Sequence, residues 1–232
     1  MDEKTKVLNI SMNLNQTFFD FCRELGERKH LLTEDNIRYY WFAQMLKQDQ
    51  VLDHYCLEDK YSGLSQISGK SELDLHYKNG TDDLRFEMKM HLDASHSIPM
   101  TQNAGEVFND LQRLQSISSG RKFFLYVTGE TMEKYYRGDS GDNKSSKEYA
   151  KVLKEVFTLP AGIIYSAWLK SGDVPKTFKE SANKTVNTEG HPIQFDMKVL
   201  FSAQFCCPAT MEDDSTPFAN GTLHVRLFEV IK

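Results

Sequence analysis

The sequence predicts a single α/β domain over residues 1–232, on three observations. Amphipathic stretches with helical spacing alternate with short apolar runs of strand length. The dipeptide Asn79-Gly80 lies between two strand-like runs, which is the strongest short-range signal of a β-hairpin. Three further strand candidates, separated by polar loops, follow residue 160. No internal repeat or clear linker divides the chain.

The first predicted elements are helices. Residues 13–29 carry aromatic side chains on one helical face. A second helix is expected over residues 33–49, with Thr33 as its N-cap. Glu34 and Asp35 fall in its first turn, where acidic side chains interact favourably with the helix dipole.

The remaining elements alternate between strands and helices. Residues 121–129 form a continuous apolar run, which is typical of a strand buried on both faces of a sheet. Residues 145–157 open with a capping-box pattern and favour a helix. The other predictions are a strand over 51–61, the hairpin over 71–91, a helix over 102–118, and strands over 161–169, 193–207 and 222–231.

Composition excludes several classes of protein. A hydrophobic content of 40% and an aromatic content of 12% exclude a disordered chain, and the formal charge of −5 argues against indiscriminate binding to polyanions. No apolar run reaches the ~18 residues of a membrane span, and no secretory signal is seen, so we expect no membrane partner and a cytoplasmic location. The cysteines lack CxxC spacing and are expected to be buried thiols in a reducing compartment: Cys22, Cys56, Cys206 and Cys207.

The predicted hairpin separates polar from apolar side chains. A two-residue loop at Asn79-Gly80 pairs Asp74 with Arg85 and Glu72 with Glu87, and a four-residue loop keeps the same alternation. In both cases one face receives Glu72, Asp74, His76, Arg85, Glu87 and Lys89. The other face receives Leu73, Leu75, Leu84, Phe86 and Met88.

Carboxylates that face each other across a hairpin repel unless a cation separates them. A divalent cation held by Asp74 and Glu87 would remove the repulsion, and oxygen ligands favour Mg²⁺ or Mn²⁺. Lys89 is on the same predicted face and can reach the same space. Such a site suits phosphodiester hydrolysis by a metal-activated water. The simpler interpretation is a solvated face on which Arg85 and Lys89 neutralise the acids.

The order of these elements resembles the PD-(D/E)XK nuclease superfamily. The helix at 33–49, Asp74 in "SELDLHY", Glu87-Met88-Lys89 in "LRFEMKM", the helix at 102–118 and the strand "KFFLYVTG" follow the order of that family. The resemblance covers residues 33–129. It implies a restriction-endonuclease-like core, a mixed central sheet flanked by helices, with a strand-rich C-terminal elaboration over about 130–232.

The resemblance also implies roles for individual residues. Asp74 and Glu87 would bind the metal, Lys89 would position the nucleophile, and Glu34 matches an acid that some branches add as a metal contact. Leu73 replaces the nominal proline of the family, and Gln102 lacks the tyrosine that accompanies it in some exonuclease branches. Glu72 and Gln102 are therefore only candidates for an additional site. Asp110 and Arg113 are expected to form a local pair on their helix.

The expected substrate is nucleic acid, most simply DNA. Three lysines in a polar loop are candidates for contacts with backbone phosphates: Lys176, Lys179 and Lys184. No phosphate-binding loop, dinucleotide fingerprint or serine-hydrolase elbow is found. Two alternatives stay open: a catalytically silent or partner-activated regulatory protein that keeps the fold, and an unrelated fold whose hairpin matches by chance. A homodimer or a partner protein is an expectation by analogy alone.

Overall fold

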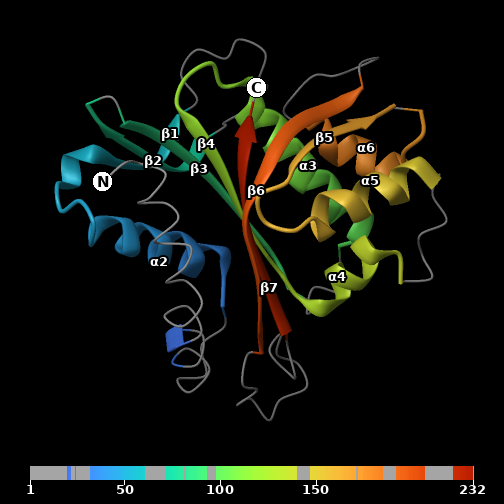
Figure 1. The fold of residues 1–232 in the computed structure, drawn as a ribbon, viewed down its shortest axis with the longest axis horizontal. Coiled ribbons are helices and arrows are strands. Elements are labelled where there is room, and N and C mark those ends of the chain that lie inside the picture. Colours follow the sequence, from blue (N-terminus) through green and yellow to red (C-terminus); the bar gives the residue numbers. More distant parts are fainter. Residues whose placement is uncertain are drawn as a thin grey trace.

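A seven-stranded, mostly antiparallel sheet flanked by helices forms the centre of this mixed α/β protein (Figure 1). The computed structural model describes residues 20, 21, 24, 32–60, 72–80, 82–92, 98–139, 147–170, 172–184, 192–206 and 222–231. Strand candidates at 161–169, 193–207 and 222–231 are confirmed, as are the helices that begin near residues 33, 102 and 145.

Helices and strands alternate in groups along the described part of the chain. The helices are α2 (Glu34–Leu46), α3 (Met100–Ser116), α4 (Glu130–Arg137), α5 (Lys147–Thr158) and α6 (Lys176–Ala182), with a 3₁₀ turn at Leu52–His54. The strands are β1 (Tyr55–Lys60), β2 (Glu72–Asn79), β3 (Asp82–His91), β4 (Arg121–Thr128), β5 (Ile164–Leu169), β6 (Ile193–Cys206) and β7 (Thr222–Ile231).

One parallel strand pair is set among antiparallel neighbours. The strand order is β1-β2-β3-β4-β7-β6-β5, and only β3 and β4 run parallel. A parallel pair requires a crossover, and α3 supplies it. The predicted strand over 121–129 is β4, which is buried along nearly its whole length as its apolar run indicates.

The hairpin forms, but its register is not the one that a two-residue loop at Asn79-Gly80 gives. Asn79 pairs with Asp82 and Lys78 with Asp83, so His76, and not Asp74, is opposite Arg85. The expected pairing of Glu72 with Glu87 is also wrong. The observed register is the one that the alternative four-residue loop gives, although Asn79 and Asp82 are themselves paired and belong to the strands, and Gly80 adopts a φ of 60° at the tip.

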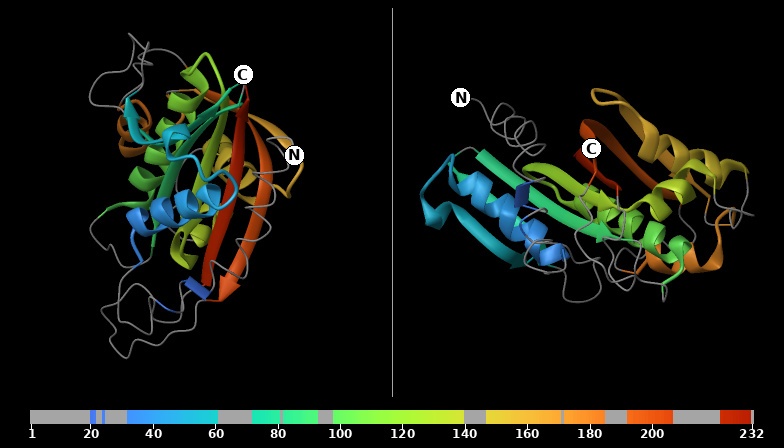
Figure 2. Two further views of the ribbon diagram at one scale, coloured as in Figure 1. Left: turned by 90° about the vertical axis from the view of Figure 1, so that its left-hand side faces the viewer. Right: turned by 90° about the horizontal axis from the view of Figure 1, so that it is seen from below.

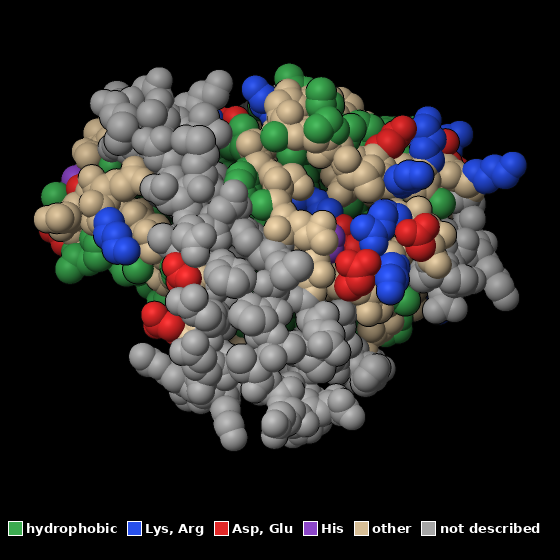
Figure 3. Space-filling view, turned by 60° about the horizontal axis from the view of Figure 1, so that its bottom comes forward, with side chains coloured by type: hydrophobic (Ala, Val, Ile, Leu, Met, Phe, Trp, Pro, Cys, Tyr) green, Lys and Arg blue, Asp and Glu red, His purple; other side chains and the backbone are tan. Residues whose placement is uncertain are grey.

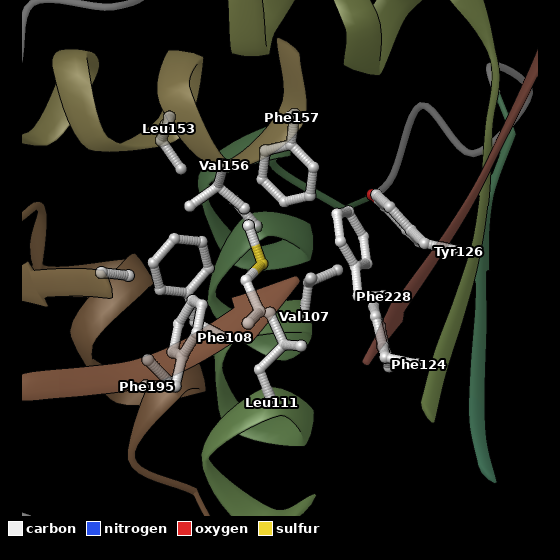
Figure 4. Packing of buried hydrophobic residues seen from close by; sticks show 14 of the residues in the cluster. Val107, Phe108, Leu111, Phe124, Tyr126, Leu153, Val156, Phe157, Phe195 and Phe228 are labelled. Atoms are coloured by element: carbon white, nitrogen blue, oxygen red, sulfur yellow. The ribbon is translucent and has the colours of Figure 1, made fainter. Parts of the chain in front are cut away.

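Two cores pack on opposite faces of the sheet. Neighbouring residues Phe123 and Phe124 on β4 point into different cores. One core contains Trp41 of α2 and covers β2 and β3, whereas the other is built on α3, α4, α5 and α6. Accordingly α2 and the α4–α5 pair lie at opposite ends of the molecule in Figures 1 and 2. Figure 4 shows the aromatic centre of the second core, around Phe108 of α3.

Several expectations need correction or lie outside the described residues. Lys176 and Lys179 lie on the helix α6 and not in a loop, because Phe178 and Ala182 are four residues apart and pack as one buried face, whereas Lys184 follows the end of α6. Cys56 is exposed on β1, contrary to the expected burial. The helix expected over residues 13–29 falls largely outside the described part. Within that part, no helix has the length and apolar character needed to cross a bilayer.

Candidate active site

The candidate site is built around a distortion of strand β2 at Asp74, which we call the break in β2. The strand continues from Glu72 to Asn79, but its pairing with β3 ends at Leu75. Leu73 and Leu75 should share a face by alternation, yet Leu73 belongs to the core under α3 and Leu75 to the core under α2. Glu58, which is opposite Asp74 between two regular pairs of the β1–β2 ladder, has a φ of 55°. Both strands therefore distort at one level, and the prediction that Leu73 shares a face with Leu75 is wrong.

The break leaves the edge of β3 open, and two carboxylates fill it. The N–H of Met88 donates to Asp74 Oδ2 at 2.6 Å, and the N–H of Met90 donates to Glu34 Oε2 at 3.2 Å. Unpaired backbone donors on a strand edge need acceptors when they are buried. Glu34 is thus more than a first-turn acid: the Thr33–Asn36 capping box starts α2 at the point where Glu34 reaches β3.

Arg38 of α2 neutralises Asp74. Its guanidinium lies 2.7 Å from Asp74 Oδ1 and only 12% of its side chain is exposed. The same guanidinium lies 3.1 Å from Asp35, three residues earlier on α2, and 3.3 Å from Glu58. Burial is the largest influence on the pKa of Arg38 and lowers it, but the surrounding carboxylates outweigh burial and raise that pKa overall.

Arg113 of α3 has the matching position on the other side of the sheet. It pairs with Glu87 of β3 and, at 3.2 Å, with Asp110, three residues earlier on its own helix. It also donates to the backbone carbonyl of Glu72 at 3.4 Å. The expected Asp110–Arg113 pair is confirmed, but the arginine connects to the strand that carries the candidate site as well.

Lys89 lies between the two helices. Its Nζ is 3.7 Å from Glu34 of α2 and 3.8 Å from Glu106 of α3. Burial is the largest influence on the pKa of Lys89 and lowers it, but four nearby carboxylates together raise it above its ordinary value. Lys89 is therefore a cation in this state. Its ammonium can hold an anion or a water molecule but cannot accept a proton.

Glu106 links Lys89 to a buried polar chain. His91 Nε2 lies 3.6 Å from Glu106, and His91 Nδ1 is 2.9 Å from the hydroxyl of Tyr126. The hydrogen bond with His91 is the main reason that the pKa of Glu106 is lowered. Burial lowers the pKa of His91. His91 is therefore a neutral support for Glu106 and Tyr126.

Carboxylates outnumber cations at this site. Among the side chains that are at most about a third exposed, the carboxylates are Glu34, Asp74, Glu87, Glu106 and Asp110 and the cations are Arg38, Lys89 and Arg113, so these carboxylates exceed the cations by two. The two other carboxylates near Arg38, Asp35 and Glu58, are more than 60% exposed, so solvent screens their charge. Burial is the main cause that raises the pKa of both Glu34 and Asp110, and other carboxylates add to it. The excess negative charge matches that of one divalent cation.

The sequence predictions for individual residues have different outcomes. Asp74 and Glu34 both accept hydrogen bonds from the open edge of β3, and Lys89 contacts Glu34, whereas the carboxylate of Glu87, also on β3, contacts Arg113 of α3. Gln102 lies in the first turn of α3 and its amide is 3.5 Å from Glu106, so it contacts the site through that carboxylate. Glu72 contributes its carbonyl oxygen to Arg113.

Lys176 and Lys179 lie on α6, which packs against α3, and Lys184 lies just after the end of that helix. Lys176 pairs with Glu180 at 3.7 Å, with 86% of the lysine side chain exposed. The Thr101 and Thr177 hydroxyls, 3.1 Å apart, join the first turns of the two helices. The lysines are thus carried on or just after the far helix of the α3–α6 pair, and their role in phosphate contact stays a prediction.

Sequence reasoning missed Arg38, Glu106 and the contact of Arg113 with Glu87. One signal was available for the arginines. Arg38 follows Asp35 by three residues, as Arg113 follows Asp110, and both pairs lie on helices that flank the hairpin. The position of Glu106, four residues after Gln102, also places both side chains on one face of α3.

The donor chemistry fits a hard divalent cation, because the site offers only carboxylate oxygens. In the observed arrangement, however, no group of three or more His, Cys, Asp or Glu side chains in the described ranges is gathered to hold a metal ion. Arg38 contacts Oδ1 of Asp74 and Arg113 contacts Oε1 of Glu87 instead. A metal ion bound through these two oxygens would compete with both arginines.

The surface at the α4–α5 end of the molecule, opposite to α2, is mixed in charge. In the face shown in Figure 3, Lys and Arg side chains alternate with Asp and Glu side chains over the described residues on the right. Comparison with protein-family models, curated proteins and solved structures finds no match for the chain. The geometry of the site therefore carries the functional argument.

Proposed function

We propose that the protein is a metal-dependent phosphodiester hydrolase, a nuclease acting on DNA, with a restriction-endonuclease-like core. The observation that carries the proposal is the break in β2. At this opened edge Asp74 and Glu34 bond to β3, the strand that carries Glu87 and Lys89, and Lys89 contacts Glu34. The succession α2-β1-β2-β3-α3-β4 supports the proposal, with β3 and β4 as the one parallel pair among the described strands.

Each residue has a role in this proposal. Asp74, Glu87 and Glu34 would hold Mg²⁺ or Mn²⁺ through carboxylate oxygens. The bound cation would supply a water of lowered pKa and neutralise phosphoryl oxygens. Lys89, kept cationic by its carboxylate neighbours, would orient the attacking water and stabilise negative charge in the transition state. Glu106 would hold the Lys89 ammonium in place, with His91 and Tyr126 behind it.

A second candidate is a catalytically silent or partner-activated protein that keeps the fold. The specific observation in its favour is that each central carboxylate already has a guanidinium partner. A buried carboxylate with an arginine partner needs no metal for stability. The two candidates differ in whether a divalent cation can displace the arginines.

A cleavage assay over a substrate panel tests the proposal. Linear duplex, circular duplex and single-stranded DNA, and RNA, are each incubated with wild type or with Asp74→Asn, in Mg²⁺, Mn²⁺ or EDTA. We expect cation-dependent cutting of at least one DNA substrate by wild type alone. Cutting that persists in EDTA or in Asp74→Asn refutes the assigned site. Absence of cutting on the whole panel, together with absence of cation binding, favours the silent protein.

A further inference from the structure

We propose that Arg38 and Arg113 are exchangeable counter-ions, which rests on the proposed function. Without a cation they neutralise Asp74 and Glu87. When a divalent cation takes those carboxylates, the guanidinium groups turn to the phosphates of the polynucleotide substrate. The two arginines, and not the lysines of α6, are thereby assigned as the phosphate-binding residues nearest to the reacting bond.

The placement of the two arginines supports the exchange. Arg38 reaches the break in β2 from α2 on one side of the sheet, and Arg113 reaches it from α3 on the other. Their ion pairs therefore enclose the position between Asp74 and Glu87 from both faces. Only 12% of each arginine side chain is exposed, so both guanidinium groups lie mostly inside the protein and not in bulk solvent.

Each arginine also keeps a second partner on its own helix. Asp35 lies 3.1 Å from Arg38 and Asp110 lies 3.2 Å from Arg113, both at a spacing of three residues. A guanidinium has five N–H donors, so it can release one carboxylate while it keeps another. Leaving the strand carboxylate therefore does not leave a buried charge without any counter-ion, which is the costly step in breaking a buried pair.

The charge balance favours a new anion after the cation binds. Before binding, the five less exposed carboxylates exceed the three cationic side chains by two, while Asp35 and Glu58 are more than 60% exposed and screened by solvent. One divalent cation balances the charge of the less exposed groups with both arginines still present. Any further negative charge that enters, such as a phosphodiester, then meets two guanidinium groups freed from Asp74 and Glu87. Their planar donors match a phosphate in a bidentate manner.

Cation binding tests the first half of the exchange. Mn²⁺ affinity is measured by isothermal titration calorimetry for wild type, Arg113→Gln, Lys89→Met and Arg85→Gln. Lys89→Met removes the same charge from the same cluster without freeing Glu87, and Arg85 is paired with Asp83 outside the site. An arginine that occupies a carboxylate competes with Mn²⁺ for it. When that arginine is removed, the apparent affinity for Mn²⁺ rises by a factor equal to one over the fraction of molecules in which the carboxylate was available. We expect Arg113→Gln to bind Mn²⁺ about tenfold more tightly than wild type and more tightly than Lys89→Met.

Binding of duplex DNA in Mn²⁺ tests the second half. The Lys89→Met background prevents turnover, and fluorescence anisotropy compares it with and without Arg113→Gln. We expect Arg113→Gln to weaken DNA binding about tenfold, the opposite sign to its effect on Mn²⁺. Loss of structure cannot produce opposite signs for two ligands. Arg113→Lys keeps the charge and serves as a second variant, with the thermal midpoint of each protein recorded.

The outcomes separate this proposal from the proposed function. Equal tightening of Mn²⁺ binding in Arg113→Gln and Lys89→Met shows a general charge effect and overturns the exchange while the metal site survives. Unchanged DNA affinity in Arg113→Gln overturns the assignment of the phosphate-binding residue alone. Absence of Mn²⁺ binding in wild type and in every variant overturns the exchange and the nuclease together.

Discussion

Replacing Gly105 by alanine should destabilise the protein, although the same change in an exposed helix is stabilising. Gly105 lies on α3 directly before Glu106. An added Cβ would be 2.5 Å from the carbonyl oxygen of Phe178, 2.7 Å from Ser181 Cβ and 3.2 Å from the backbone nitrogen of Ala182. Two of these atoms belong to the backbone of α6, so no side-chain rotation can relieve the contact. Helices α3 and α6 must therefore separate.

The magnitude follows from two opposing terms. Alanine in place of glycine favours the helix by about 1 kcal/mol. Overpacking of a filled site costs about 1–3 kcal/mol, and contacts with backbone belong at the upper end. The free energy of unfolding should therefore fall by about 2 kcal/mol, which lowers the thermal midpoint by roughly 4–8 °C for a chain of this size.

The assay is urea denaturation of wild type, Gly105→Ala and Gly172→Ala, followed by circular dichroism. Gly172 is a matched control because a Cβ there meets no atom within 4 Å. It should change the free energy of unfolding by less than about 0.5 kcal/mol. If Gly105→Ala is as stable as wild type, α3 and α6 are not in close contact at Gly105. That contact then does not fix the position of Glu106, the next residue on α3.

Three further predictions concern stability. Phe108 is fully buried against three other phenylalanines, so Phe108→Ala should lower the free energy of unfolding in urea by about 3–5 kcal/mol. Arg226→Met leaves buried Glu133 without its bidentate partner and should cost about 3–5 kcal/mol in the same assay, whereas the double change with Glu133→Leu should recover part of the loss. Burial acts to raise the pKa of Asp49, but hydrogen bonds led by that from Tyr77 lower it to about 2 from 3.8. Because the folded-state pKa is the lower one, the stabilisation is present above about pH 4 and is lost as the pH falls toward 2, and Asp49→Asn should remove this part of the acid sensitivity measured by thermal melts.

The features that were predictable from the sequence are local ones. Thr33 caps α2 as its residue type indicates, and the apolar run of β4 becomes a strand covered on both faces. The four residues Leu75, Leu84, Phe86 and Met88 share one core because alternation holds within each regular stretch of strand. Such features depend on neighbours in the sequence, so the pattern contains them.

The features that were not predictable arise where distant segments meet. Strict alternation along β2 predicts the wrong core for Leu73. The break at Asp74 depends on Glu58 and Arg38, which come from β1 and α2. The arginine partners of Asp74 and Glu87 depend on how α2 and α3 pack over the sheet. A charged pair on a helix surface looks the same in sequence whether its arginine is solvated or reaches a strand.

The prediction of a loop around Lys176 was wrong for a different reason. The proline, lysines and serine of this segment are typical of a loop, and they outweighed the spacing of Phe178 and Ala182. In the structure those two residues pack against α3 and fix a short helix. Tertiary packing therefore overrides a weak local preference.

The most direct test of the central claim is the single-turnover rate of DNA cleavage in Mg²⁺ by wild type, Lys89→Met and Arg85→Gln. Both variants lose one cation from β3, but only Lys89 contacts the carboxylates of the site. We expect cleavage that EDTA abolishes, a rate near wild type for Arg85→Gln, and a loss of about 10²–10³-fold for Lys89→Met. Equal rates for Lys89→Met and wild type would contradict the central claim.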